Sequence, residues 1–98
     1  MIVIKKPVRF LWDNGNKDKN WEKHRVANEE CEEIFFDNNK KIFKDKKHSF
    51  KEKRHIILGE TKKRRLLYTV FTLRGEKIRV ISSRDINKKE EKLYEKNT

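Results

Sequence analysis

Residues 66–85 read LLYTVFTLRGEKIRVISSRD, and this stretch decides the fold. Leu66 to Arg74 is apolar at both odd and even positions, which is typical of a strand that is buried on both faces and central in its sheet. Gly75 and Glu76 form a tight turn. From Lys77 to Arg84 apolar and polar residues alternate, which predicts a second strand antiparallel to the first.

Two more strands are predicted just before this hairpin. Lys53 to Glu60 alternates and reaches the central strand through a basic hairpin loop, Thr61 to Arg65. Lys41 to Lys44 is a weaker strand. Together the four segments predict an antiparallel meander.

The N-terminal third combines a short strand with two predicted helices. Val8 to Trp12 is predicted as a strand, residues 13–16 as a turn with a helix cap, and Lys17 to His24 as a short helix. A second helix begins at Asn28. Its inward stripe is expected at Cys31, Ile34 and Phe35, and its solvated face at Glu29, Glu30, Glu32 and Glu33.

A last helix is predicted from a cap at Asp85 or Asn87 to about Lys96, with Leu93 and Tyr94 as its apolar anchors. The order is therefore a strand, two helices, an antiparallel meander and a terminal helix. This order predicts the α+β class, with the helices grouped against one sheet.

Length and composition limit the architecture. The 98 residues predict a single domain, 1–98, with flexible ends at 1–7 and 96–98. A hydrophobic fraction of 34% and an aromatic fraction of 10% argue against a disordered chain. Cys31 is the only cysteine, which excludes an internal disulfide and a Cys-rich zinc site. Without a membrane-length apolar run or a signal-peptide pattern, the chain is expected to be cytoplasmic.

The net charge of +11 is concentrated in one segment. Residues 38–65 carry 12 basic and 3 acidic side chains, whereas residues 22–37 carry 2 basic and 6 acidic ones. Like charges packed this closely favour a surface that contacts phosphates. Charge alone does not distinguish a nucleic acid from an acidic protein partner.

The inventory of reactive side chains favours cofactor-free chemistry. No carboxylate pair, Ser–His–Asp set, phosphate-binding glycine loop or metal-ligand cluster is recognisable, and His24, His48 and His55 are scattered, which argues weakly against zinc. Cationic and imidazole groups suffice to cleave RNA. The ribose 2′-OH is the nucleophile, and the protein needs a base, an acid and cations around the phosphorane.

One predicted helix face carries four polar residues at positions i, i+3, i+6 and i+7: Lys17, Asn20, Lys23 and His24. This face is either a binding surface or the plain solvated side of a helix. Arg54 and Arg79 alternate with aliphatic residues on strands, where a solvent-facing arginine is the commoner explanation. Trp12 and Trp21 either stack on bases or pack at the edge of the core.

The chain resembles the BrnT toxins of BrnT/BrnA type II toxin–antitoxin systems from about residue 8 to residue 95. The resemblance begins with Phe10–Leu11–Trp12–Asp13 and continues along the whole meander. It also includes Lys17, Asn20, Lys23–His24, Val26, Glu29–Glu30, Ile34–Phe35–Phe36–Asp37, His48, Glu52–Lys53–Arg54, Ile57–Leu58–Gly59, Val70–Phe71–Thr72, Ile78–Arg79–Val80–Ile81–Ser82–Ser83–Arg84, Lys89–Glu90 and Tyr94–Glu95.

The resemblance implies a compact RelE-like ribonuclease fold and a metal-independent endoribonuclease that cuts RNA and halts translation. It also implies a BrnA-like ribbon-helix-helix antitoxin as partner. Only this antitoxin would contact operator DNA when the pair binds there. The implied catalytic residues are Lys23 and His24 for proton transfer and Arg54, Arg79 and Arg84 for the scissile phosphate. The implied substrate-binding residues are Trp12, Lys17, Asn20 and Tyr94.

Two positions depart from the family pattern. Arg25 stands where the family usually has glycine after Lys–His, a helix-ending position that favours positive φ. Ser83 replaces the usual alanine of the Ile–Ser–Ala–Arg motif, which is a mild change.

Two readings compete with the toxin. One is a non-catalytic basic module that binds nucleic acid, with an affinity that falls steeply with salt. The other is a module whose acidic protein partner binds residues 38–65. If the chain is a toxin, the same basic surface is expected to serve RNA and the antitoxin in turn.

Overall fold

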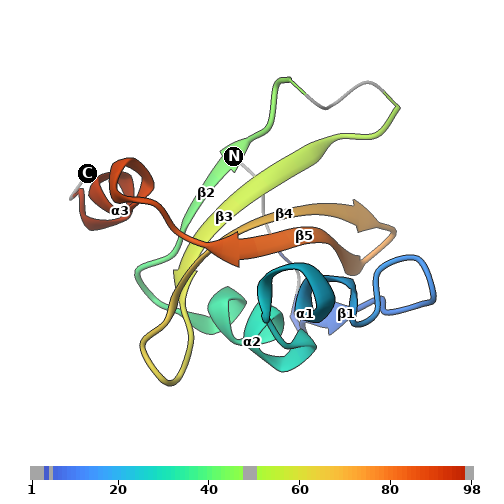
Figure 1. Ribbon diagram of the computed structural model, residues 1–98. Coiled ribbons are helices and arrows are strands. Elements are labelled where there is room, and N and C mark those ends of the chain that lie inside the picture. Colours follow the sequence, from blue (N-terminus) through green and yellow to red (C-terminus); the bar gives the residue numbers. More distant parts are fainter. Residues whose placement is uncertain (1–3, 5, 48–50, 97–98) are drawn as a thin grey trace.

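The protein is seen in a computed structural model that describes residues 4, 6–47 and 51–96, so the predicted flexible ends at 1–7 and 96–98 lie largely outside the described residues. Five strands form one mixed sheet in the order β1–β5–β4–β3–β2 (Figure 1). The strands are β1 (Arg9–Phe10), β2 (Lys41–Lys44), β3 (Arg54–Glu60), β4 (Leu66–Arg74) and β5 (Lys77–Asp85). The helices are α1 (Lys19–His24), α2 (Asn28–Glu33), the 3-10 turn η1 (Ile34–Phe36) and α3 (Lys88–Glu95).

The α+β class and the central hairpin are confirmed. β4 pairs antiparallel with β5 on one side and with β3 on the other, which makes it the middle strand. The β4–β5 register shifts between Val70 and Phe71, so Ile81 is an extra residue, as in a β-bulge. Because of this shift, Val80 before the bulge and Ser83 after it are both buried.

The prediction of a fully antiparallel sheet is wrong at its N-terminal strand. The predicted strand Val8 to Trp12 is reduced to the two residues of β1, and β1 pairs parallel with the start of β5. The pairing ends early because residues 13–17 turn away from the sheet, where the N–H groups of Asn16 and Lys17 both donate to the Asp13 carbonyl. Local alternation shows that a segment is extended, but it does not encode the direction of its distant partner.

Helices α1 and α2 lie on one side of the sheet, and α3 lies at its far end (Figure 1). We call the side packed against α2 the core face and the opposite side the outer face. The core face carries a continuous apolar cluster of buried residues from the α1–α2 link, α2, η1 and the three long strands: Val26, Cys31, Ile34, Phe35, Ile57, Leu67, Phe71, Ile78 and Val80. This cluster confirms the predicted inward stripe of the second helix.

The first helix begins two residues later than predicted. Asp18 has φ of 60°, which an α-helix does not tolerate, so α1 starts at Lys19 and Lys17 lies in the preceding turn. α2 begins at Asn28 as predicted, and it ends in the 3-10 turn η1.

The glutamates of α2 are mostly not the solvated face that the sequence predicts. Glu30 pairs with Arg65 at 3.1 Å, and Glu32 accepts a hydrogen bond from the indole N–H of Trp12 at 2.7 Å. Glu33 accepts from the backbone N–H of Lys62 at 3.0 Å. Each of these glutamates ties α2 to another segment, and Glu29 is the exposed one.

The terminal helix starts as predicted, but only one of its two predicted apolar anchors holds it against the rest of the protein. The Asn87 side chain accepts from the Glu90 N–H, and the Glu90 carboxylate accepts from the Asn87 N–H, which together form a capping box. Leu93 is 46% exposed, so its prediction as an apolar anchor is wrong. Tyr94 does anchor the helix, because its hydroxyl donates to the Asp37 carboxylate at 2.6 Å.

Cys31 provides a test of this core. Burial raises the pKa of its thiol from 9.0 to about 11, so the thiolate population falls about 100-fold. We expect iodoacetamide at pH 8 to alkylate the native protein at least ~100-fold more slowly than the protein in guanidinium chloride. Mass spectrometry of the two time courses measures the ratio. Equal rates would contradict the burial of Cys31.

Candidate active site

Two of the predicted arginines lie in one row across the sheet. Arg54 on β3 is paired in register with Thr72 on β4, and Thr72 is paired with Arg79 on β5. Residues paired in this way point to the same face, here the outer face, and the backbones of the two arginines are two strand spacings apart, about 10 Å. The row therefore brings two arginines to the same face, one on each side of the buried Thr72, and guanidinium groups are the side chains best suited to bind phosphate.

The guanidinium of Arg79 is held in place by the turn before α1. Its Nη1 donates to the Asp13 carboxylate at 2.7 Å and to the Asn16 amide oxygen at 3.3 Å, and its side chain is 13% exposed. The hydrogen bond from Arg79 lowers the pKa of Asp13 below its usual value. Gly15 makes room for this contact, since a Cβ there would come within 2.7 Å of Arg79 Nη2.

Arg84 belongs to a second group on the same face. Its two terminal nitrogens donate to the two oxygens of Glu90, both at 2.8 Å, and its guanidinium lies 4.0 Å from the centre of the Tyr68 ring. The Glu90 hydrogen bonds raise the pKa of Arg84 and lower that of Glu90. Five residues of strand separate Arg79 from Arg84, about 16 Å, so the three predicted arginines do not converge on one phosphate.

Lys23 and His24 are exposed at the end of α1, beside the end of β5. The contact runs through Arg65, whose Nη2 donates to the His24 carbonyl at 3.3 Å and whose Nε donates to Asp85 at 2.6 Å. Hydrogen bonding to Arg65, aided by the nearby charge of His24, lowers the pKa of Asp85. His24 and Lys23 are therefore at the Arg84 end of β5, far from the Arg54–Arg79 row.

Arg65 is a site residue that sequence reasoning missed. The sequence pattern places it in the basic hairpin loop, but its guanidinium bonds Asp85, Glu30 and the carbonyls of His24 and Arg25. It thereby joins α1, α2 and β5. The sequence contains one relevant signal, because a helix that ends in a left-handed residue leaves unpaired carbonyl groups that a cation can bind. It does not indicate which of the neighbouring cations in this loop binds them.

The backbone at Arg25 has the positive φ that its helix-ending position predicts. It is the C-cap of α1 with φ of 55°, and its N–H lies against the carbonyls of Asn20 and Trp21. The arginine side chain lies 5.4 Å from the Trp21 ring. The helix end beside His24 therefore keeps a left-handed residue although glycine is absent.

Replacing Arg25 tests this strain. We expect Arg25→Gly to raise the free energy of unfolding by about 1 kcal/mol, because glycine adopts positive φ without the steric cost of a Cβ. Urea titration followed by circular dichroism measures the change. Arg25→Ala is the matched control, since it removes the same side chain but keeps the Cβ, and it should not stabilise. Equal effects of the two variants would contradict the explanation.

Asn20 does not share the exposed face of Lys23 and His24, so that prediction is wrong. It is 3% exposed, and its Oδ1 accepts from the backbone N–H of Ser83 at 2.9 Å. Asn16, one turn earlier, donates to the carbonyl of Val80 at 3.1 Å. The two amides occupy the edge of β5 beyond the short β1, where no strand in the described part of the chain pairs with its backbone. Asn20 is thus a structural residue that places α1.

Trp12 also takes a structural position. Its ring packs against the core cluster and its indole N–H donates to Glu32, so the packing alternative describes it better than base stacking. Trp21 is 47% exposed beside Arg25. Tyr94 lies on α3 against Asp37, and burial together with that hydrogen bond raises its pKa. The substrate-binding role of Tyr94 stays a prediction.

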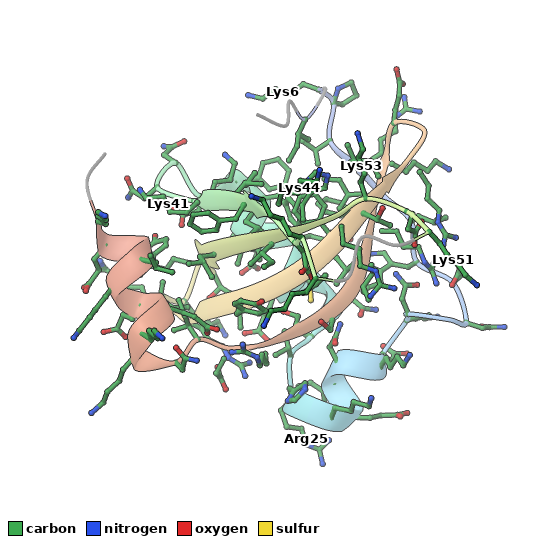
Figure 2. The ribbon with its side chains drawn as sticks, turned by 90° about the horizontal axis from the view of Figure 1, so that it is seen from above. Lys6, Arg25, Lys41, Lys44, Lys51 and Lys53 are labelled. Carbon is green, nitrogen blue, oxygen red and sulfur yellow. The ribbon has the colours of Figure 1, made fainter. Side chains whose placement is uncertain are left out.

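The basic segment 38–65 divides between two ends of β3. Lys44, Lys51 and Lys53 lie along the β2–β3 side of the sheet, with Arg25 on the opposite side at α1 (Figure 2). A second group of exposed cations, Lys62, Lys63 and Arg64, lies in the β3–β4 hairpin loop, about 23 Å away along the strand. The row of Arg54 and Arg79 is at the lysine-rich β2–β3 end.

The other histidines do not join these groups in the described part of the chain. His55 is on the core face, 5.4 Å from the Phe71 ring, and burial lowers its pKa. His48 lies outside the described residues. Among residues 4, 6–47 and 51–96, no group of three His, Cys, Asp or Glu side chains is arranged to hold a metal ion.

The chain is thus a small basic α+β protein whose sheet presents arginines and lysines as a phosphate-binding surface would. A family model described as "Ribonuclease toxin, BrnT, of type II toxin-antitoxin system" matches residues 12–90. The chain belongs to this family, whose members are toxins with an antitoxin partner and an RNA substrate. A search among curated proteins finds no match. Within the described residues no helix is long and apolar enough to cross a membrane.

Proposed function

We propose that this protein is a single-domain endoribonuclease toxin that cleaves RNA without a metal ion and so inhibits translation in the cytoplasm. In this proposal the fold is RelE-like, and a ribbon-helix-helix antitoxin neutralises the toxin and alone carries the pair to operator DNA. The observation that carries the enzymatic part is the exposed pair Lys23 and His24 at the end of α1, which Arg65 ties to the Arg84 end of β5. The row of Arg54, Thr72 and Arg79 on the outer face, next to the lysine-rich end of β3, supports the binding of RNA. Family membership supports RNA as the ligand.

The two groups of side chains suggest a division of labour along β5. Arg54 and Arg79, with Lys17 in the adjoining turn, bind one phosphate and set the register of the RNA. About 16 Å further along, Arg84 faces the scissile phosphate while His24 and Lys23 transfer protons to and from it. Proton transfer requires hydrogen-bond reach, so His24 cannot act on a phosphate held by Arg79. Arg84 must exchange at least one Glu90 hydrogen bond for a phosphate oxygen.

The chemistry needs no further group. The 2′-OH loses its proton to a base and attacks the adjacent phosphorus, and the 5′-oxygen of the next nucleotide leaves with a proton from an acid. The products are a 2′,3′-cyclic phosphate and a 5′-hydroxyl. Arginine stabilises the phosphorane that forms between these steps.

The test compares wild type with the double variant His24→Ala/Arg79→Ala. We expect wild type to arrest growth when expressed alone and to fragment labelled RNA in EDTA, and the double variant to do neither. Intact RNA with the wild type, both alone and on translating ribosomes, would overturn the enzymatic proposal. A mobility shift without fragments would favour the non-catalytic nucleic-acid-binding module.

A further inference from the structure

Phe36, at the end of η1, is a large apolar side chain that is mostly exposed to solvent. It is 62% exposed, more than the other large apolar side chains noted as exposed in the described chain, Trp21, Phe43 and Leu93. Phe36 lines two separate hollows, of about 690 Å³ and 350 Å³. An aromatic ring exposed on a ridge between two hollows is typical of a surface that binds another chain.

The larger hollow has the opposite charge to the rest of the molecule. Five of its eight lining residues are acidic, and Lys62 is the one basic residue among them. The protein as a whole carries +11. Carboxylates at this density repel the phosphates of RNA and attract lysine and arginine.

Two of these carboxylates have no internal role. Glu32, Glu33 and Asp37 already accept hydrogen bonds from Trp12, Lys62 and Tyr94. Glu29 and Glu60 line the same hollow, and their carboxylates make no hydrogen bond or ion pair with any described residue, although the backbone N–H of Glu60 donates to Asp37 at 2.9 Å. Their charges remain available to a partner beside the Phe36 ring.

The smaller hollow on the other side of Phe36 is apolar in its depth. Ile4, Val8, Phe35 and Ile42 line it, and Lys6 and Lys40 add two positive charges. A segment that crosses the ridge therefore meets an apolar hollow flanked by lysines on one side of Phe36 and an acidic hollow on the other. A peptide whose apolar side chains enter the smaller hollow and whose basic side chains face the acidic hollow complements this surface.

We propose that the Phe36 ridge and its two hollows are the docking surface for a basic, apolar-anchored segment of the antitoxin. This inference rests on the proposed function, in which an antitoxin holds the toxin. It also separates the two ligands, because RNA binds the outer face and the antitoxin segment binds the side of η1. The earlier expectation that both use the basic surface of residues 38–65 is replaced by two surfaces.

The test uses the protein encoded beside the toxin gene and measures its Kd for the toxin by calorimetry. We expect Phe36→Ala to weaken binding at least ~10-fold, as truncation of a central aromatic anchor does. Glu29→Lys/Glu60→Lys should weaken it as well and reduce its dependence on salt. Leu93→Ala and Glu95→Lys are matched controls on α3, where the same kinds of change should leave the Kd within about twofold.

RNA cleavage by each free variant distinguishes the two proposals. We expect Phe36→Ala to cleave RNA like the wild type and to arrest growth even when the antitoxin is present. Unchanged antitoxin binding by Phe36→Ala and by the charge-reversal variant would overturn the docking surface while leaving the ribonuclease proposal intact. Loss of RNA binding instead of antitoxin binding would assign the ridge to RNA and also overturn it. Absence of any complex with the wild type would overturn the docking surface together with the proposed antitoxin.

Discussion

His24→Ala is expected to lower kcat for RNA cleavage by about 100-fold or more while leaving KM nearly unchanged, because a positioned proton-transfer group contributes about 10²–10⁴ to the rate. Arg79→Ala is expected to do the reverse and raise KM at least ~10-fold, since its row binds RNA away from the reacting bond. Initial rates over a range of RNA concentrations separate the two constants. Lys63→Ala, which removes an exposed cation from the hairpin loop, is the control for simple loss of charge.

The expected difference between the two variants, an effect on kcat or an effect on KM, follows from where the two side chains are held relative to β5. Arg79 is fixed at the start of the strand by Asp13, whereas His24 is fixed at its end through Arg65. If Arg79→Ala lowered kcat as strongly as His24→Ala and left KM unchanged, the scissile phosphate would lie at the Arg54–Arg79 row. If His24→Ala kept more than half of the wild-type kcat, His24 would not be a catalytic residue.

Gly59→Ala is expected to be the most destabilising single methyl addition in the protein. A Cβ at this position would lie 2.7 Å from the Ile34 Cβ and 2.9 Å from the Ile34 carbonyl oxygen. The backbone contact cannot be relieved by a rotamer change, so η1 must move away from β3. We expect a loss of about 3 kcal/mol, at the upper end for overpacked cores. Urea denaturation at constant pH measures it.

Gly75→Ala is the matched control for Gly59→Ala. Gly75 has φ of 62° but no atom within 4 Å of its missing Cβ, so alanine there meets strain without a clash. We expect a loss of about 1 kcal/mol. A similar loss at both positions would show that η1 adapts to the extra methyl group, which would contradict the close packing inferred at Gly59.

Most of the fold follows from local patterns of sequence. The apolar run from Leu66 to Arg74 and the alternation after Gly75 place β4 and β5, and the stripe of Cys31, Ile34 and Phe35 orients α2. The Asn87 cap of α3 is equally local. In each case the deciding contacts are between residues close in the chain or within one periodic face.

The errors that matter for the site concern long-range contacts. The parallel direction of β1 depends on a partner 68 residues away, Lys77 for Arg9. Asn20 is a second case of an unpredicted long-range contact. The helical pattern predicts that its side chain faces solvent, but the side chain is buried against the unpaired edge of β5. Within the site, simple alternation along the strand places Arg79 and Arg84 on opposite faces of the sheet. The register shift at Ile81 brings both arginines to the outer face, and this shift depends on pairing with β4.

The central claim is cleavage through the ribose 2′-OH by the protein's own side chains. It is tested most directly by incubating the purified toxin in EDTA with an end-labelled RNA and with its fully 2′-O-methylated counterpart, free and on translating ribosomes, and analysing the new ends. We predict that only the unmodified RNA is cut and that its fragments end in 2′,3′-cyclic phosphate and begin with 5′-hydroxyl. Cleavage of the methylated strand, or activity that EDTA abolishes with 3′-hydroxyl and 5′-phosphate ends, would contradict the account.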